Sequence, residues 1–342
     1  MNIRTISTLS LILLSAVTCH SRSLSSDNTR ASSQTDSTAG TELARPAVVR
    51  RSIAEGAIQV GLSAAVNAVA TELLKHKVHR MRPDGTEDNS FPSRHTSWAF
   101  TLSTIASNEL YVHSPWWPAG FQAAASAVGI QRVLSKRHYP SDVAAGAFTG
   151  VLSTEIGYTI GRLIMGDRRS AWTLGYPDIN QASIDMTTDA IFPLGNAGHS
   201  SDGSKISLGP GFGSEVMANI PVGETLYASA GAAMEVYSIR GGGKFLDTMT
   251  LLGAQAGGGW RRNFGYRESW TLETTITAGA GRLLHTDGWN HSRYSFYSNL
   301  RAGITHRVTA KFAFGARAGY RIMTVPHAVS AITVGVFSRA VF

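Results

Sequence analysis

A short segment, FPSRHTSWAF, places Ser93, Arg94 and His95 directly before a stretch with helical periodicity. A helix start exposes unpaired backbone N–H groups and the positive end of the peptide dipoles. A hydroxyl, a guanidinium and an imidazole at such a point can converge on an anion together with those N–H groups. The segment therefore predicts an anion-binding site at a helix N-terminus.

Two further segments carry the charges and nucleophiles that a phosphate site needs. Upstream, KHKVHRMRP contains Lys75 and Arg82; downstream, QRVLSKRHYPSD contains Arg132, His138 and Asp142. A phosphoryl group in transfer spreads negative charge over three equatorial oxygens, so positioned cations supply much of the catalysis. Lysine and the planar, forked guanidinium of arginine suit that role, and histidine can act as nucleophile or acid.

The order and spacing of the three segments resemble the signature of the type 2 phosphatidic acid phosphatases, which bacterial acid phosphatases and vanadium haloperoxidases share. That signature has a lysine and an Arg-Pro, then Pro-Ser-Gly-His, then Ser-Arg with a spaced histidine and aspartate. The resemblance implies that His138 attacks phosphorus to form a phosphohistidine, that Asp142 holds the opposite ring nitrogen, and that His95 protonates the leaving oxygen. It implies no metal and no cofactor, and a phosphate-binding set made of Lys75, Arg82, Ser93, Arg94 and Arg132.

The chain departs from that signature at two positions. Arg94 stands where the family has glycine, and Gln131 stands where it has serine. Because an ordinary residue also offers a backbone N–H, we expect Arg94 to contribute its backbone rather than its side chain. Pro140 lies between His138 and Asp142, so we expect these two side chains to meet across a turn and not along one continuous helix.

Residues 47–166 are rich in alanine, with apolar residues at helical spacing in IAEGAIQVGLSAAVNAVATELL and DVAAGAFTGVLSTEIGYTIGRLIM. The pattern predicts an all-α phosphatase domain of four or five helices, fewer than the six usual in the family. Glu155 interrupts one apolar stretch, and His113, Pro115 and Pro118 interrupt another, so the sequence predicts no clean apolar run of membrane-spanning length. We expect these helices to pack on each other.

Beyond Gly166 the apolar period changes from helical to two. In VTAKFAFGARAGYR, for example, apolar side chains alternate with glycine and isolated charges. A soluble β-sandwich is one interpretation, but long strands, a polar face that mixes glycine with charges, and a last strand that ends on Phe342 favour a membrane barrel. Residues 183–342 are therefore predicted to form an antiparallel outer-membrane β-barrel of about eight strands, with a lumen filled by side chains.

The N-terminal sequence, MNIRTISTLSLILLSAVTCHS, has one arginine, an apolar run and small residues, which is the pattern of a secretory signal peptide over residues 1–21. Residues 22–46 are rich in serine and threonine and predict a disordered linker, and residues 167–182 are predicted to link the two domains. Cys19 is the only cysteine, so no disulfide is possible within one chain. We interpret it as a bystander removed with the signal, with lipidation as the alternative.

Together these features predict a two-domain protein of the bacterial outer membrane, with the lipid bilayer as a partner. Because both termini of an even-stranded barrel lie on the periplasmic side, we expect the catalytic domain to hang from the periplasmic face. A formal net charge of +8 favours anionic partners, and no motif supports nucleic acid binding.

The predicted activity is hydrolysis of a phosphomonoester. Phosphatidic acid, phosphatidylglycerophosphate, a polyprenyl pyrophosphate and a soluble ester all fit the sequence as substrates. A vanadium-dependent haloperoxidase is the alternative enzyme, since vanadate in the same site mimics the phosphoryl transition state. A structural or adhesive barrel with an inactive helical domain is the third reading, and the intact charged positions argue against it.

Overall fold

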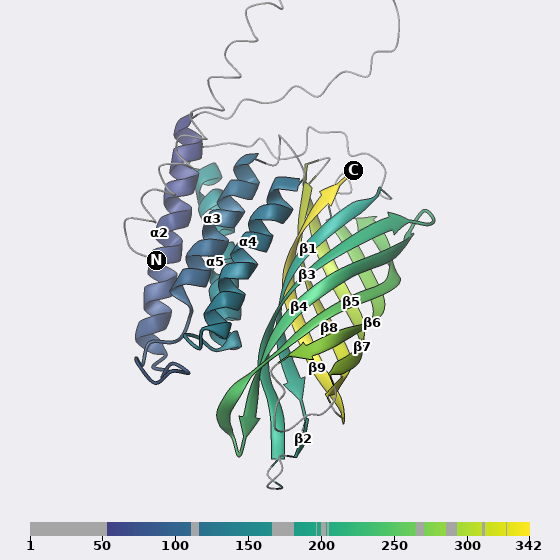
Figure 1. The fold of residues 1–342 in the computed structure, drawn as a ribbon. Helices are drawn as coiled ribbons and strands as arrows, with labels where there is room; N and C mark the ends of the chain where they lie inside the picture. The colour runs from purple at the N-terminus through teal and green to yellow at the C-terminus, as the bar shows by residue number, and fades with distance from the viewer. Residues whose placement is uncertain are drawn as a thin grey trace, which may run out of the picture.

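The computed structural model describes residues 53–110, 116–165, 181–195, 197–199, 203, 205–264, 270–284, 293–309, 312–325 and 327–342. Within them, four helices precede a closed antiparallel β-barrel, which confirms the predicted fold class (Figure 1). The predicted signal peptide with Cys19, the 22–46 linker and most of the 167–182 linker lie outside the described residues.

The helices are α2 (Ile53–Lys77), α3 (Arg94–Leu110), α4 (Trp116–Leu134) and α5 (Pro140–Ile164). Each runs back along the one before it, and α5 packs against both α2 and α3 (Figure 1). The C-terminal ends of α2 and α4 and the N-terminal ends of α3 and α5 therefore lie at the same end of the bundle. All three sequence motifs belong to that end.

The polarity of α2 is reversed relative to a helix of a water-soluble bundle. Its buried side chains are polar and recur every four residues, as Glu55, Gln59, Ser63, Asn67 and Thr71, while Val69 and Leu73 are exposed. Helices that pack inside a bilayer use small and polar residues between them and turn apolar residues outward. By length and composition α2 is able to cross a membrane, so the prediction that no such run exists is wrong.

Close packing in the bundle depends on glycine. A Cβ on Gly157 of α5 would lie 2.4 Å from the backbone nitrogen of Ser63 in α2, and a Cβ on Gly146 would lie 2.6 Å from the carbonyl oxygen of Ser93. Both distances are below van der Waals contact, so only glycine permits the observed approach. The second contact fixes the start of α3 beside α5.

Eight long strands close the barrel, and a two-residue strand, β2 (Gly198–His199), pairs with β3 at one end. Neighbours in sequence pair antiparallel from β3 to β9, and β1 closes the ring by pairing with both β3 and β9. This confirms the predicted strand number and excludes the β-sandwich. The long strands are β1 (Ser183–Leu194), β3 (Lys205–Pro221), β4 (Leu226–Gly241), β5 (Lys244–Phe264), β6 (Trp270–Leu284), β7 (Tyr294–Thr309), β8 (Phe312–Val325) and β9 (His327–Val341).

Ion pairs fill the barrel lumen. In β8, Ala318 and Tyr320 face outward and Arg321 faces inward, as the alternation predicts. Inside, Arg301 bonds Glu215 at 2.8 Å, and similar pairs join Arg321 to Glu235 and Arg339 to Asp185. Buried charges require such partners, and here they occupy the interior of a barrel of the size that side chains can fill.

The helical domain lies alongside the barrel and not at its end (Figure 1). Helices α4 and α5 contact β1 and β3, and α4 also contacts β9. Phe212, Val236 and Val336 project from the barrel into one apolar cluster with α4 and α5, including Val133 and Val143. The expectation that the helical domain hangs from one end of the barrel is therefore contradicted, because part of the outer barrel wall is the surface on which the helices pack.

Candidate active site

All eight predicted site residues lie at the bundle end where the three motifs meet. Backbone bonds tie the motifs together: the N–H of Ser93 donates to the carbonyl of Asp142 at 2.9 Å, and the N–H of His138 donates to the carbonyl of Arg132 at 3.3 Å. Lys75 lies in the last turn of α2 and donates to the carbonyl of Asn89 at 2.6 Å, which anchors the loop between α2 and α3.

His138 is held in one tautomer. Its Nδ1 lies 2.8 Å from the carbonyl oxygen of Ser90, and a carbonyl only accepts, so Nδ1 carries the proton and Nε2 is left with its lone pair. Burial lowers the pKa of His138 to about 3, helped by the positive charges of Arg82, Lys75 and Arg132 and opposed by the bond to Ser90. The imidazole is therefore neutral at neutral pH, which is the state that a nucleophile needs.

Asp142 does not hold the ring nitrogen of His138 as the resemblance implied. Its Oδ2 accepts from the hydroxyl of Ser90 at 2.5 Å and from the backbone N–H of Tyr139 at 3.0 Å. The carboxylate therefore fixes Ser90, and the backbone carbonyl of Ser90 in turn fixes the imidazole. Asp142 therefore positions His138 indirectly, through Ser90, and not by the direct contact that was predicted. As expected from Pro140, α5 begins at that residue, and His138 and Asp142 lie on two sides of a turn.

Arg80 and Ser90 are the functional residues that the sequence prediction missed. The Nη1 of Arg80 donates to Asp142 at 2.7 Å and to the hydroxyl of Ser141 at 2.8 Å, and its guanidinium lies 4.0 Å from the ring centroid of Tyr139. Arg80 lies inside the first motif, so its position was a usable signal. Ser90 immediately precedes the second motif, and nothing in its type distinguished it.

Arg82 retains donor capacity that suits an anion. Its Nη2 bonds Glu87 at 2.9 Å and Asn89 at 3.0 Å, whereas its Nε is buried and has no partner among the described residues. A buried, unpaired N–H of a guanidinium is costly unless a ligand completes it. Burial lowers the pKa of His95 to about 4, and the positive charges of Arg132 and Arg82, which also act on His138, add to this effect. His95 is therefore neutral before substrate binds, and it can act as an acid only when a bound phosphate anion raises its pKa.

The second motif starts α3. Ser93 is fully buried, and its hydroxyl accepts from the N–H of Thr96 at 3.5 Å and from the hydroxyl of Thr96 at 2.9 Å, as a helix N-cap does. The hydroxyl keeps its own proton to donate. The side chain of Arg94 pairs with Glu72 of α2 at 2.5 Å. Its charge also acts on Lys75 and His95, and the expectation that only its backbone contributes stays a prediction.

Comparison with known proteins agrees with this site. Residues 56–163 match the family model of the PAP2 superfamily, so this part of the chain is a PAP2 superfamily domain. A lipid A 1-phosphatase from Porphyromonas gingivalis is 28% identical over 264 residues, which are 72% of this chain and 59% of that protein. The bacitracin transport permease protein BcrC from Bacillus licheniformis is 47% identical over 66 residues, 19% of this chain and 30% of that protein. The chain thus spans less than two thirds of both relatives.

Solved structures match the two parts of the chain separately. LpxE from Aquifex aeolicus is 25% identical, with a TM-score of 0.28, over 31% of this chain and 68% of that one. Neisserial surface protein A is 15% identical, with a TM-score of 0.32, over 47% of this chain and 97% of that one.

Proposed function

We propose that the helical domain hydrolyses the phosphate monoester of a membrane lipid through a phosphohistidine, in a protein that the barrel anchors in the outer membrane. The observation that carries the proposal is the state of His138. The imidazole is neutral, its Nε2 is the nitrogen left without a proton, and it lies in a cluster with Lys75, Arg82 and Arg132.

The two chemical steps follow from these groups. Nε2 of His138 forms a bond to phosphorus while the bond to the ester oxygen breaks, and His95 gives a proton to the departing alkoxide. Water then attacks phosphorus, His95 takes back a proton, and inorganic phosphate leaves as the imidazole is restored. The cations stabilise the charge on the equatorial oxygens during both steps.

A lipid phosphate is the substrate class favoured by the relatives, since one of them is a lipid A 1-phosphatase. Phosphatidic acid and phosphatidylglycerophosphate share the same phosphomonoester. The prediction of a periplasmic catalytic domain assumed that this domain lies at the end of the barrel. Because the helices pack on the side of the barrel instead, we propose that the helical domain lies within the outer membrane.

A phosphate-release screen on the purified full-length chain tests the proposal. We expect release from lipid A, phosphatidic acid or phosphatidylglycerophosphate in mixed micelles, and quenching during turnover at alkaline pH should trap an acid-labile phosphoprotein. His138→Ala should abolish both signals. Hydrolysis at the wild-type rate by His138→Ala would contradict the assigned nucleophile, and release from none of these esters would contradict the function.

A further inference from the structure

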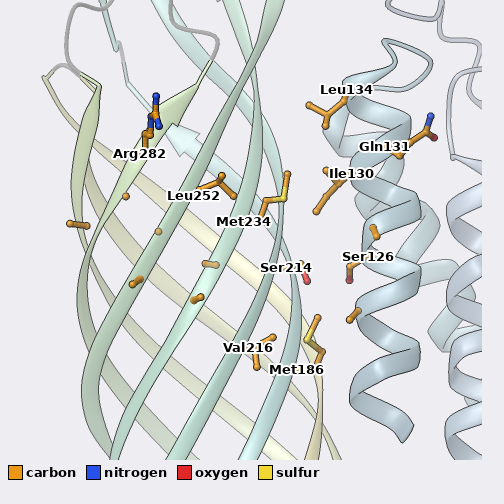
Figure 2. Close-up of a pocket in the computed structure, with 18 of the residues that line it drawn as sticks. Ser126, Ile130, Gln131, Leu134, Met186, Ser214, Val216, Met234, Leu252 and Arg282 are labelled. Atoms are coloured by element: carbon orange, nitrogen blue, oxygen red, sulfur yellow. The ribbon is translucent and has the colours of Figure 1, made fainter. Parts of the chain in front are cut away.

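An open apolar groove of about 1260 Å³ runs between α4 and the outer wall of the barrel (Figure 2). Ile130 and Leu134 line it from the helix, and Met234 and Leu252 line it from strands β4 and β5. Its size exceeds the 300 to 1,000 Å³ or so of sites for drug-sized ligands. Its walls are surfaces that, in an outer-membrane barrel, face lipid.

One end of the groove lies at the end of the bundle that carries the active site. Gln131 and Leu134 line this end of the groove from the last turn of α4, which also carries Arg132. On the opposite rim, Arg282 of β6 points out of the barrel, and Figure 2 shows it at the same end of the groove as Leu134. Among the described residues that line the groove, Arg282 is the one cation, and it lies toward the active-site end of the bundle.

An outward-facing arginine fixes the depth of that end. Arginine on the lipid face of a barrel is costly at the bilayer midplane and close to neutral at the interface. Tyr294, the pairing partner of Arg282 on β7, is 64% exposed, and aromatic side chains form girdles at the same interface. The rim is thus at the level of lipid headgroups, with the apolar part of the groove below it at the level of acyl chains.

We propose that the groove binds the acyl chains of the lipid phosphate substrate while Arg282 contacts its anionic headgroup. The inference rests on the proposed function and specifies where the lipid lies. Charge complementarity favours an anionic lipid as the occupant. Its headgroup would lie beside Arg282, and its acyl chains would lie against the apolar lining of the groove. The substrate enters sideways from the bilayer, between the helical domain and the barrel.

Filling the groove tests this assignment. Ala254 lines the groove on β5, and Ala254→Trp should raise the KM for dioleoyl phosphatidic acid in mixed micelles about tenfold. The KM for p-nitrophenyl phosphate, which has no acyl chain, should stay within twofold. Ala302→Trp is the matched control, because Ala302 is also exposed on the outer wall but lies on β7, away from the groove, and it should change neither value.

Crosslinking gives a readout that does not depend on turnover. Phosphatidic acid with a diazirine in one acyl chain should label peptides of α4 and β5, and Ala254→Trp should remove most of that labelling. An unchanged lipid KM in Ala254→Trp, or equal labelling by a diazirine phosphatidylcholine, would overturn the proposal. Specific labelling without hydrolysis of any ester would refute the proposed function and leave the lipid site standing.

A separate observation concerns which leaflet the site faces. At one end of the molecule, Trp116 of α4 packs on Phe342 with ring centroids 4.9 Å apart. At the other end, Lys136 pairs with Asp247 at 3.1 Å and Tyr139 packs on Phe245, both at the start of β5. The active-site end of the bundle therefore lies beside the β4–β5 hairpin, opposite the barrel termini (Figure 1).

The connections between strands distinguish the two ends of the barrel. At the end with the termini, the strands are joined by residues 222–225, 265–269 and 310–311. At the other end they are joined by the two longest connections, 195–204 and 285–293, and by two short ones, 242–243 and residue 326. In bacterial barrels with an even number of strands, the short turns and termini face the periplasm and the longer loops face the exterior. The active site is on the long-loop side.

The helical domain also carries a lipid-facing surface. The apolar side chains of α5 that are between 36 and 76% exposed are Leu152, Ile156, Ile160 and Leu163. Exposed apolar surfaces of this extent mark contacts with a membrane or a partner. Trp116 and Trp117 are half-exposed at the terminal end, where tryptophan is typical of the membrane interface.

We infer that the helical domain lies within the outer membrane beside the barrel and that its active site opens toward the outer leaflet. Single cysteines test this in whole cells. Asp88→Cys lies in the exposed loop at the active-site end, and Glu224→Cys lies in the exposed turn at the opposite end. The unsubstituted chain, whose only cysteine is Cys19, serves as the blank.

A membrane-impermeant biotin maleimide should label Asp88→Cys in intact cells. It should label Glu224→Cys only after the outer membrane is permeabilised. The reverse pattern would show that the active site faces the periplasm. Labelling of both cysteines only after permeabilisation would show that the active-site end is not exposed at the cell surface. Either result overturns the inference. Because the readout is chemical labelling, it is independent of phosphatase activity.

Discussion

Arg80 and Asp142 form an ion pair of 2.7 Å in which the carboxylate is wholly buried and the guanidinium is 28% exposed. The pair joins the first sequence motif to the start of α5. Because Asp142 also accepts from Ser90, and the carbonyl of Ser90 holds His138, the guanidinium supports the proposed nucleophile through two other residues. Arg80 therefore acts by positioning and need not touch the substrate.

Replacing Arg80 by alanine should destabilise the protein and slow turnover. The change leaves a buried carboxylate without its cation, which costs about 3 kcal/mol in comparable pairs. We expect a loss of that order in the free energy of unfolding, measured by urea titration in detergent, with a lower kcat and a nearly unchanged KM. Arg80→Lys should recover part of kcat.

Arg137→Ala is the control for this change. Arg137 pairs with Asp84 at 3.1 Å, but its side chain is half-exposed, and such surface pairs contribute about 1 kcal/mol or less. If the two variants lost the same stability, the buried pair would have no special role.

His95→Ala should separate the acid from the nucleophile. A general acid matters least when the leaving oxygen is already a weak base. We therefore expect His95→Ala to retain most activity on p-nitrophenyl phosphate and to lose about 100-fold or more on alkyl esters. Steady-state rates on both esters provide the measurement, and an equal loss on both would contradict the role of His95.

Arg94→Gly should be nearly neutral for catalysis, because the Arg94 side chain is held in an ion pair with Glu72 and we expect only its backbone to contact the substrate. KM and kcat for lipid phosphate should stay within about twofold of wild type, a change worth roughly 0.4 kcal/mol. A large rise in KM would show that the side chain leaves Glu72 to bind substrate.

Gly146→Ala should reduce activity without a change of charge. A Cβ at this position would lie 2.6 Å from the Ser93 carbonyl, so α3 and α5 must separate and displace the start of α3. A lower kcat in a folded protein is the expected result. Gly120→Ala in α4 is the control, since a Cβ there meets nothing within 4 Å, and activity should persist.

His138 should remain neutral through the acidic range. Its pKa is lowered to about 3, whereas an unfolded histidine titrates near 6.5. Between these values the unfolded chain binds the proton and the folded chain does not, so this group makes stability fall as pH decreases from about 6.5 toward 3. Nitrogen-15 NMR of histidine-labelled protein should show the Nδ1–H tautomer of His138 at pH 5, and a midpoint between pH 6 and 7 would contradict it.

The residue patterns predicted the parts of the protein that follow a local rule. Alternation in β8 identified Arg321 as facing the lumen, and motif spacing placed Arg132 and His138 at one site. The role of Ser90 was not predictable, because it depends on a loop whose shape no short pattern encodes. Arg80 lies inside the first motif, which was a usable signal, but its partner Asp142 could be identified only from the structure. The lipid-like polarity of α2 was visible in the spacing of Gln59, Ser63 and Asn67, but only the packing shows that this polar stripe is the buried one.

The packing of the helical domain on the side of the barrel could not be predicted from the sequence, for a different reason. A period of two separates the inside of a barrel from the outside and says nothing about what covers the outside. Val336 lies on the same side of β9 as Ile332 and Val334, yet it is 7% exposed because α4 packs over it. Polar Gln122 in α4 belongs to the same contact.

Gln122 spans the seam at which the barrel closes. Its amide donates to Thr188 of β1 at 3.2 Å and accepts from Ser338 of β9 at 2.6 Å, and β1 and β9 are the first and last strands of the ring. The helix thus recognises a surface that exists only after the two ends of the sheet have joined. We therefore expect the proposed activity to appear only after the barrel has inserted and closed. Before β1 and β9 pair, a newly exported chain lacks the surface on which α4 packs, so its helical domain cannot reach the observed arrangement.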